Sequence, residues 1–178
     1  MEIIDIKNNR KYLEEYVTLC SKEWGTSRSD KEYIDNKINE ILNEDKVISI
    51  LGLIDNEELI GFISLFKYDG NERRDLTPWY ATICVKEEYR GKGYSKLLSD
   101  SILEKARSLG YDKVYLKSYL NNYYEKFGAK YIETLNNGEK LFYIDLWKKE
   151  AKNASFLFNN SCIFDIILIM SIRRVYGY

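Results

Sequence analysis

Strand, glycine loop and helix follow one another around the segment Val85-Lys86-Glu87-Glu88-Tyr89-Arg90-Gly91-Lys92-Gly93-Tyr94-Ser95. An apolar run from Trp79 to Val85 predicts a strand before the loop, and a long amphipathic pattern follows it. The first N–H groups of a helix lack partners within it, and the peptide dipoles favour negative charge there. We therefore expect an anion-binding turn, because two glycines let a phosphate approach the main chain and Arg90 and Lys92 add positive charge.

This loop differs from two better-known phosphate loops. The chain contains no G-x-x-x-x-G-K-[ST] motif, and the dinucleotide pattern G-x-G-x-x-G would require glycine where Lys96 stands. What remains is R-G-x-G-x-S over residues 90–95. An ordinary tight turn with solvated charges is the alternative interpretation, so the neighbouring segments must decide between them.

The residues after the loop predict a helix and a second strand. Apolar residues recur at helical spacing at Tyr94, Leu98, Ile102, Ala106 and Leu109. Gly110 then marks the helix end, and Val114-Tyr115-Leu116 predicts the next strand. This strand–loop–helix–strand order implies two parallel strands joined by a right-handed crossover.

A second motif, Asn121-Asn122-Tyr123-Tyr124-Glu125-Lys126-Phe127-Gly128-Ala129, follows that strand. Together the two motifs resemble the GCN5-related N-acetyltransferase (GNAT) family, with its Q/R-x-x-G-x-G/A loop and its Tyr-Glu-Lys-x-Gly-Phe segment. Ser95 replaces the last Gly or Ala of the loop pattern. The resemblance covers roughly residues 47–147 and implies an α/β (α+β) domain with the acyl-CoA N-acyltransferase fold. That fold is a mixed, mostly antiparallel, twisted sheet flanked by helices.

The resemblance implies a cofactor site for acetyl-CoA as cosubstrate. The diphosphate is assigned to Arg90, Gly91, Lys92, Gly93, Tyr94 and Ser95, and the pantetheine arm to the main chain of Ile83, Cys84 and Val85. In the family this strand splays from its parallel neighbour, often with a bulge. Asn121 is the candidate for a further cofactor contact, with Asn122 as the alternative.

The resemblance also implies a general acid. Tyr124 stands before the Glu-Lys pair, where a phenol can protonate the departing thiolate of coenzyme A. Tyr123 is the rival for this role, and simple packing of Tyr124 is the structural alternative.

The chain contains no histidine, which narrows the chemistry. Ser–His–Asp triads, Cys–His dyads and His-rich metal sites are excluded, and we expect no metal ion. Direct attack of an amine on a thioester needs neither a histidine nor a metal ion. In the family that the chain resembles, the general base is often a glutamate on this strand, but the strand from Trp79 to Val85 has none. The general base is therefore open between Glu72, Asp75 and a water-mediated route. A nucleophilic Cys84 is disfavoured, since a cysteine within a strand usually packs as a small apolar residue.

The first half of the chain predicts the acceptor side. Residues 2–6 predict a strand, residues 8–22 and 30–43 two helices, and residues 47–54 and 59–68 a hairpin. Asp30 is a plausible N-cap, and residues 24–27 predict a loop beside a substrate pocket. The acceptor is expected to be a primary amine on a small molecule or peptide. Four acidic residues near the expected cleft would suit a cationic amine: Glu57, Glu58, Glu72 and Asp75. The alternative interpretation is that they form an ordinary solvent-exposed run of charges.

Composition indicates a soluble cytoplasmic protein. With 27 basic and 28 acidic residues among 178, the net charge argues against nucleic acid or an anionic membrane surface as partner. The cysteines at 20, 84 and 162 are far apart and form no C-x-x-C, which indicates reduced thiols. The charged N-terminus does not predict a signal peptide.

The acetyltransferase-like domain is expected to span residues 1–149, its last strand being residues 139–147 after a turn at Gly138. Residues 150–178 form an apolar extension whose run from Cys162 to Met170 is too short to span a bilayer. Packing on the core, a homodimer contact, an exchanged strand and a weak membrane-surface anchor are the roles open to it.

Two other functions stay open on the sequence. One is a non-catalytic acyl-CoA-binding regulatory module of the same fold, and the other is an unrelated α/β domain that binds a small molecule. The first would bind coenzyme A without turnover, and the second would not bind it.

Overall fold

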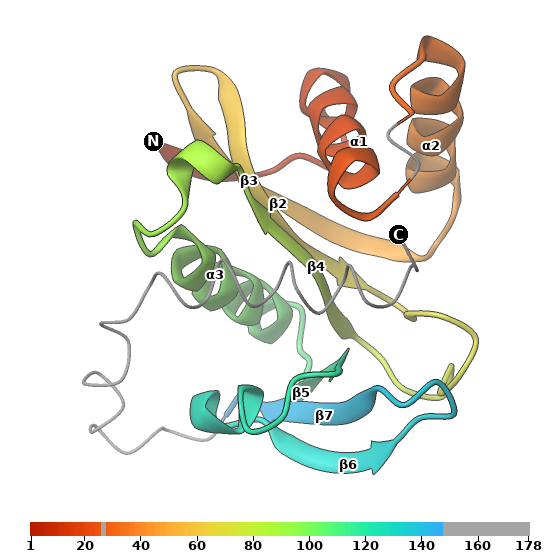
Figure 1. The fold of residues 1–178 in the computed structure, drawn as a ribbon, viewed down its shortest axis with the longest axis vertical. Coiled ribbons are helices and arrows are strands. Elements are labelled where there is room, and N and C mark those ends of the chain that lie inside the picture. The colour runs from red at the N-terminus through yellow and green to blue at the C-terminus, as the bar shows by residue number, and fades with distance from the viewer. Residues whose placement is uncertain (26–27, 148–178) are drawn as a thin grey trace.

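Seven strands form one mixed sheet in the order β1-β2-β3-β4-β5-β7-β6 in the computed structural model, which describes residues 1–25 and 28–147 (Figure 1). The strands are β1 Glu2–Asp5, β2 Val47–Asp55, β3 Glu58–Phe66, β4 Trp79–Val85, β5 Lys113–Ser118, β6 Lys130–Thr134 and β7 Lys140–Asp145. Among the strands of the described residues, only β4 and β5 pair in parallel, and the other neighbours are antiparallel. The predicted mixed, mostly antiparallel sheet is confirmed.

In the part of the chain that the structure describes, three α-helices and two short 3₁₀ helices connect the strands: α1 Arg10–Trp24, α2 Lys31–Asn43, η1 Glu87–Tyr89, α3 Tyr94–Ser108 and η2 Tyr124–Phe127. The N-cap prediction for α2 is confirmed, because Tyr33 N donates to Asp30 Oδ1 at 3.0 Å. Helix α1 continues to Trp24, so the prediction that this residue lies in a loop is wrong. None of the helices within the described ranges is long and apolar enough to cross a membrane.

The helices cover both faces of the sheet. Leu98, Ile102 and Ala106 of α3 pack in the core on one face, and Leu13 of α1 and Ile38 of α2 pack in the core on the other. Figure 1 shows α1 and α2 on one side of β2, β3 and β4, and α3 on the opposite side. The central strands β2 and β3 are therefore buried on both faces, which explains their nearly continuous apolar sequences.

Strands β4 and β5 touch at one point and then diverge. Their register has the single pair Trp79 with Tyr115, and Tyr115 N donates to the Pro78 carbonyl at 2.9 Å. Beyond Trp79, no register pair joins β4 to β5 in the part of the chain described. Figure 1 shows β5, β7 and β6 separating from β4 as a second half of the sheet.

A bulge interrupts β4 on its other edge. Ala81 pairs with Ser64 and Ile83 pairs with Ile63, so Thr82 is an extra residue with no partner on β3. Its φ of 38° lies in the left-handed region, which a β-branched residue rarely adopts. The splay and the bulge expected for this strand are thus both present.

The predicted boundary at residue 149 and all roles considered for residues 150–178 lie outside the described residues.

Candidate functional site

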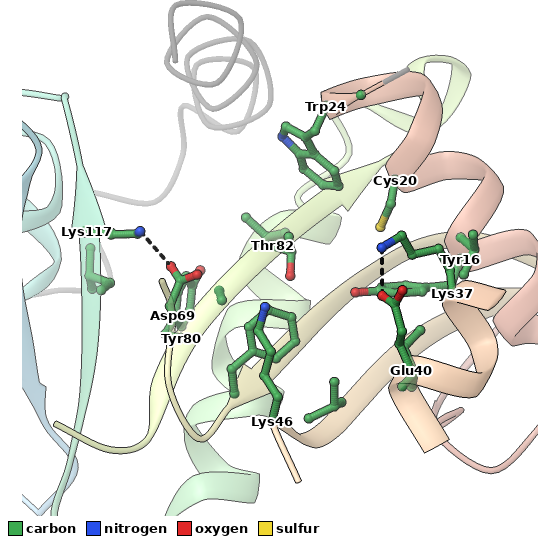
Figure 2. A pocket seen from close by; sticks show the side chains of 18 of the residues that line it. Tyr16, Cys20, Trp24, Lys37, Glu40, Lys46, Asp69, Tyr80, Thr82 and Lys117 are labelled. Carbon is green, nitrogen blue, oxygen red and sulfur yellow. Dashed lines mark hydrogen bonds and ion pairs between the residues drawn. The ribbon is translucent and has the colours of Figure 1, made fainter. Parts of the chain in front are cut away.

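A cavity of about 690 Å³ lies where β4 and β5 diverge (Figure 2). Helix α1 contributes Tyr16, Cys20 and Trp24 to its wall, and helix α2 contributes a charged edge that includes Lys37 and Glu40. The bulged part of β4 from Tyr80 to Ile83 and residues 116–119 at the end of β5 complete it. Strands β4 and β5 share only one register pair in the described structure, so no ladder of hydrogen bonds fills the space between them beyond that pair.

Tyr124 lines the cavity from η2 and is buried. Its ring packs against Tyr123, with the ring centres 5.0 Å apart and the planes nearly perpendicular, and against Phe142. Burial raises the pKa of Tyr124 well above its ordinary value, so the phenol keeps its proton at neutral pH. Tyr123, the rival candidate, is not among the residues that line the cavity.

Tyr80 connects the cavity to the first turn of α3. Its hydroxyl lies 2.6 Å from Ser99 Oγ, and Ser99 Oγ donates to the Ser95 carbonyl at 2.8 Å. Because the Ser99 proton is used in that second bond, Tyr80 is the donor in the first. Burial raises the pKa of Tyr80 to about 12, which keeps this donor protonated.

The β4 bulge places a buried hydroxyl beside the cavity. Thr82 Oγ1 has no hydrogen-bond partner among residues 1–25 and 28–147. The nearby Tyr16 hydroxyl lies 3.2 Å from Ser64 Oγ, and no bond of acceptable geometry joins it to Thr82. A buried unpaired hydroxyl and a left-handed φ both cost free energy, and such costs concentrate at functional sites.

The glycine loop lies at the start of α3, outside the cavity lining. Gly91 and Gly93 both have left-handed φ, of 76° and 81°, and Gly93 is the N-cap residue of α3. A Cβ placed on Gly93 would meet nothing within 4 Å, so the space in front of this main chain is open. No acidic side chain lies in the first turn of α3, which favours an anion there.

Arg90 is oriented differently from the sequence expectation. Its Nε donates to the Val85 carbonyl at 2.8 Å, and its Nη2 lies 3.4 Å from Glu23 Oε1 on α1. The two side chains are only 19% and 17% exposed. The guanidinium therefore ties the loop to β4 and α1, while Lys92 is exposed and lies over the Tyr89 ring.

The other predicted cofactor residues are divided between core and surface. Ile83 lines the cavity, whereas the Cys84 and Val85 side chains pack in the two cores. A role for these two residues therefore rests on their main chain. Asn121 and Asn122 are exposed and do not line the cavity.

None of the acidic residues singled out from the sequence lines the cavity. Glu58 pairs with Lys86 at 2.6 Å and Glu57 with Lys11 at 3.4 Å. Asp75 pairs with Arg73 at 2.8 Å, and Glu72 accepts a hydrogen bond from Asn136. The structure therefore gives no support to Glu72 or Asp75 as the general base.

Among the described residues, four other carboxylates and three lysines line the cavity instead: Glu40, Glu44, Asp69, Glu139, Lys37, Lys46 and Lys117. Sequence reasoning missed them all, although one signal was available. Lys117 interrupts the apolar run of β5 at the position that shares a face with Tyr115. Burial alone would lower the pKa of Lys117, but Asp69 and Glu139 outweigh burial and raise it.

Comparison with known proteins assigns the family. The sequence model of the Acetyltransferase (GNAT) family matches residues 11–129, about two thirds of the chain. A search of curated proteins finds no match.

Solved structures share the fold at low sequence identity. An aminoglycoside 6'-N-acetyltransferase from Enterococcus faecium has a TM-score of 0.62 and 16% identity, covering 85% of this chain and 100% of its own. YncA from Salmonella typhimurium, solved with its cofactor acetyl-CoA, has a TM-score of 0.57 and 16% identity, covering 86% and 98%. The PaiA N-acetyltransferase from Thermoplasma acidophilum, solved with coenzyme A, has a TM-score of 0.52 and 20% identity, covering 82% and 99%.

The acyl-CoA N-acyltransferase fold predicted from the sequence is therefore confirmed. On the family match and this shared fold, the chain belongs to the GNAT family and is an acetyl-CoA-dependent N-acetyltransferase.

Proposed function

We propose that the protein moves acetyl from acetyl-CoA to a primary amine, on a small molecule or peptide, by direct attack. The observation that carries this proposal is the cavity at the divergence of β4 and β5, with a protonated phenol, Tyr124, in its wall. A space open on the β5 side of β4 can take a thioester arm along the strand. The three separated cysteines suit a cytoplasmic place of action.

The cofactor lies along β4 in this proposal. The main chain of Ile83, Cys84 and Val85 holds the pantetheine arm, since β4 has no register pair with β5 in this part. The diphosphate occupies the glycine loop from Arg90 to Ser95, where the space before Gly93 is open. Asn121 stays a proposed contact at the cofactor's edge. Two of the structural neighbours were solved with coenzyme A or acetyl-CoA.

The reaction needs one proton removed and one supplied. The amine, once neutral, attacks the thioester carbon, and collapse of the tetrahedral intermediate breaks the carbon–sulfur bond. Tyr124 donates its proton to the departing thiolate. In this proposal, one of the carboxylates that line the cavity accepts the proton from the amine.

The test combines binding with turnover. Acetyl-CoA at about a hundred times its dissociation constant should stabilise the fold by roughly 2.7 kcal/mol, which raises the unfolding midpoint by roughly 5–11 °C. A panel of primary amines should then release coenzyme A. Stabilisation without release from any amine would favour the acyl-CoA-binding regulatory module, and no stabilisation would contradict the cofactor site.

A further inference from the structure

Lys46 is a cavity ammonium without an acidic partner. It lies between α2 and β2, is partly buried, and its Nζ lies 5.1 Å from the centre of the Phe66 ring. No carboxylate pairs with it within residues 1–25 and 28–147. Figure 2 shows its nitrogen directed into the middle of the cavity, between the Lys117–Asp69 pair and the Lys37–Glu40 pair.

The other two lysines of the cavity are neutralised by neighbouring side chains. Lys37 Nζ lies 2.7 Å from Glu40 Oε2. Lys117 Nζ lies 3.5 Å from both Asp69 Oδ2 and Glu139 Oε2. The contact with Phe66 attracts the Lys46 ammonium and holds its side chain, but an aromatic ring carries no net charge to balance it.

The part of the cavity around Lys117 carries excess negative charge. Asp69 and Glu139 share the single ammonium of Lys117, which leaves one negative charge in surplus. Glu139 is only 8% exposed, so water screens this charge poorly. Glu44, which also lines the cavity, is exposed to solvent, where its charge is screened.

The cavity is thus polarised, negative near Asp69 and Glu139 and positive at Lys46. A molecule with an ammonium at one end and a carboxylate at the other matches this arrangement. Its ammonium would lie beside Asp69 and Glu139. Its carboxylate would supply the counter-charge that Lys46 lacks among the described residues.

We propose that the acceptor is an amine that also carries a carboxylate, as an amino acid does, and that Lys46 binds this carboxylate. This inference rests on the proposed function, and it names the substrate class of the same site. It differs from the cationic amine suggested by the acidic residues of the sequence, because those residues do not reach the cavity.

The test uses matched sets of acceptors with the full-length protein and acetyl-CoA. Each of the common amino acids that carries a primary amine is compared with its carboxamide and its decarboxylated amine, and kanamycin is added as a polycation. We expect the preferred acceptor to be a carboxylate-bearing member, acetylated at least about tenfold more efficiently than its carboxamide. Lys46→Met should remove that preference, and Lys46→Glu should shift it towards the decarboxylated amine.

Lys67→Met is the matched control. Lys67 neighbours Lys46 across the β2–β3 ladder, where its N–H donates to the Lys46 carbonyl at 2.7 Å. Its ammonium pairs with Asp45 in solvent, with the two side chains 53% and 71% exposed, and it does not line the cavity. This variant should keep the wild-type order of acceptors.

Three results would overturn the inference: no acetylation of any carboxylate-bearing acceptor, equal or better turnover of carboxamides or kanamycin, or a preference unchanged in Lys46→Met. The proposed function is judged separately, by the acetyl-CoA stabilisation and by acetylation of any amine at all. A protein that acetylates kanamycin best would keep the proposed function and lose this inference.

Discussion

Trp79 of β4 and Tyr115 of β5 form the register pair at which the two halves of the sheet meet, and their ring centres lie 6.1 Å apart. From this point β4 turns away, and the bulge at Thr82 increases the local twist. The cavity forms because β4 and β5 are joined at this pair and have no further register pair beyond it in the described residues. The position of this pair therefore sets where the cavity begins.

Tyr124→Phe should lower kcat by about 100-fold, because it removes the proton donor while keeping the ring that packs on Tyr123 and Phe142. The KM for acetyl-CoA and the unfolding midpoint should change little. Steady-state kinetics with a primary amine acceptor measure the effect, and Tyr123→Phe is the control. Unchanged turnover in Tyr124→Phe would remove this residue from the mechanism.

Gly93→Ala and Gly110→Ala form a matched pair. Both glycines have left-handed φ, of 81° and 86°, and an added Cβ meets nothing within 4 Å at either. Each substitution should therefore cost about 1 kcal/mol of stability for the backbone alone. Only Gly93→Ala should also weaken acetyl-CoA binding, because its methyl group enters the space proposed for the diphosphate. Calorimetric titration measures this, and equal affinities would argue against a diphosphate at Gly93.

Arg90→Ala should lower the stability of the fold, whereas Lys92→Ala should lower the affinity for acetyl-CoA. Arg90→Ala removes the bond to the Val85 carbonyl and leaves Glu23 without this partner, so it should lower the free energy of unfolding by about 1–3 kcal/mol. Lys92→Ala should leave stability unchanged and weaken only acetyl-CoA binding. Urea unfolding compared with cofactor titration separates the two effects. A fully stable Arg90→Ala protein would mean that the guanidinium contacts add nothing to the fold.

Thr82→Val should stabilise the protein by about 1 kcal/mol, because it removes a buried hydroxyl without a described partner and keeps the side-chain shape. The unfolding midpoint should rise by about 2–4 °C. Thr82→Ser, which keeps the hydroxyl, is the control. A lower midpoint for Thr82→Val than for Thr82→Ser would show that the hydroxyl is paired in solution.

Alkaline pH should destabilise the fold through its buried tyrosines. Burial raises the folded-state pKa of Tyr80 to about 12, and it raises those of Tyr16 and Tyr124 as well. Tyrosines of the unfolded chain ionise near about pH 10. This stability is therefore complete below about pH 10 and is lost as pH rises towards the folded-state values. Urea unfolding measured as pH rises above about 10 should show a steeper loss of unfolding free energy in the wild type than in Tyr80→Phe. Equal slopes would contradict a raised pKa for Tyr80 in the folded state.

Local sequence predicted the elements closely. β4 has the predicted bounds, and the helix after the loop was predicted from its apolar spacing, with Gly110 in the expected left-handed conformation. The Asn56–Glu57 turn also formed where the hairpin was expected, with left-handed φ at both residues. These features depend on neighbours in the chain, where side-chain period, caps and turn residues act directly.

The candidate site was predicted only in part. Tyr124, predicted as the general acid, lines the cavity from the short helix that follows β5, and its catalytic role stays a prediction. The direction of the Arg90 side chain could not be read from the loop, since Glu23 lies 67 residues away in sequence. Asp69, Lys117 and Glu139 come from three separate segments, and no local pattern brings them together.

The amino-acid sequence by itself determined most of the strands and helices and the glycine loop, since these follow from short-range periodicity and backbone preference. Two motifs in the sequence also carried the resemblance to the family. Only the tertiary structure decided that β7 lies between β5 and β6, that the divergence of β4 from β5 begins after Trp79, and that Lys46 faces a cavity without a described acidic partner. These outcomes depend on contacts between distant segments. Burial of apolar surface selects such contacts for the chain as a whole.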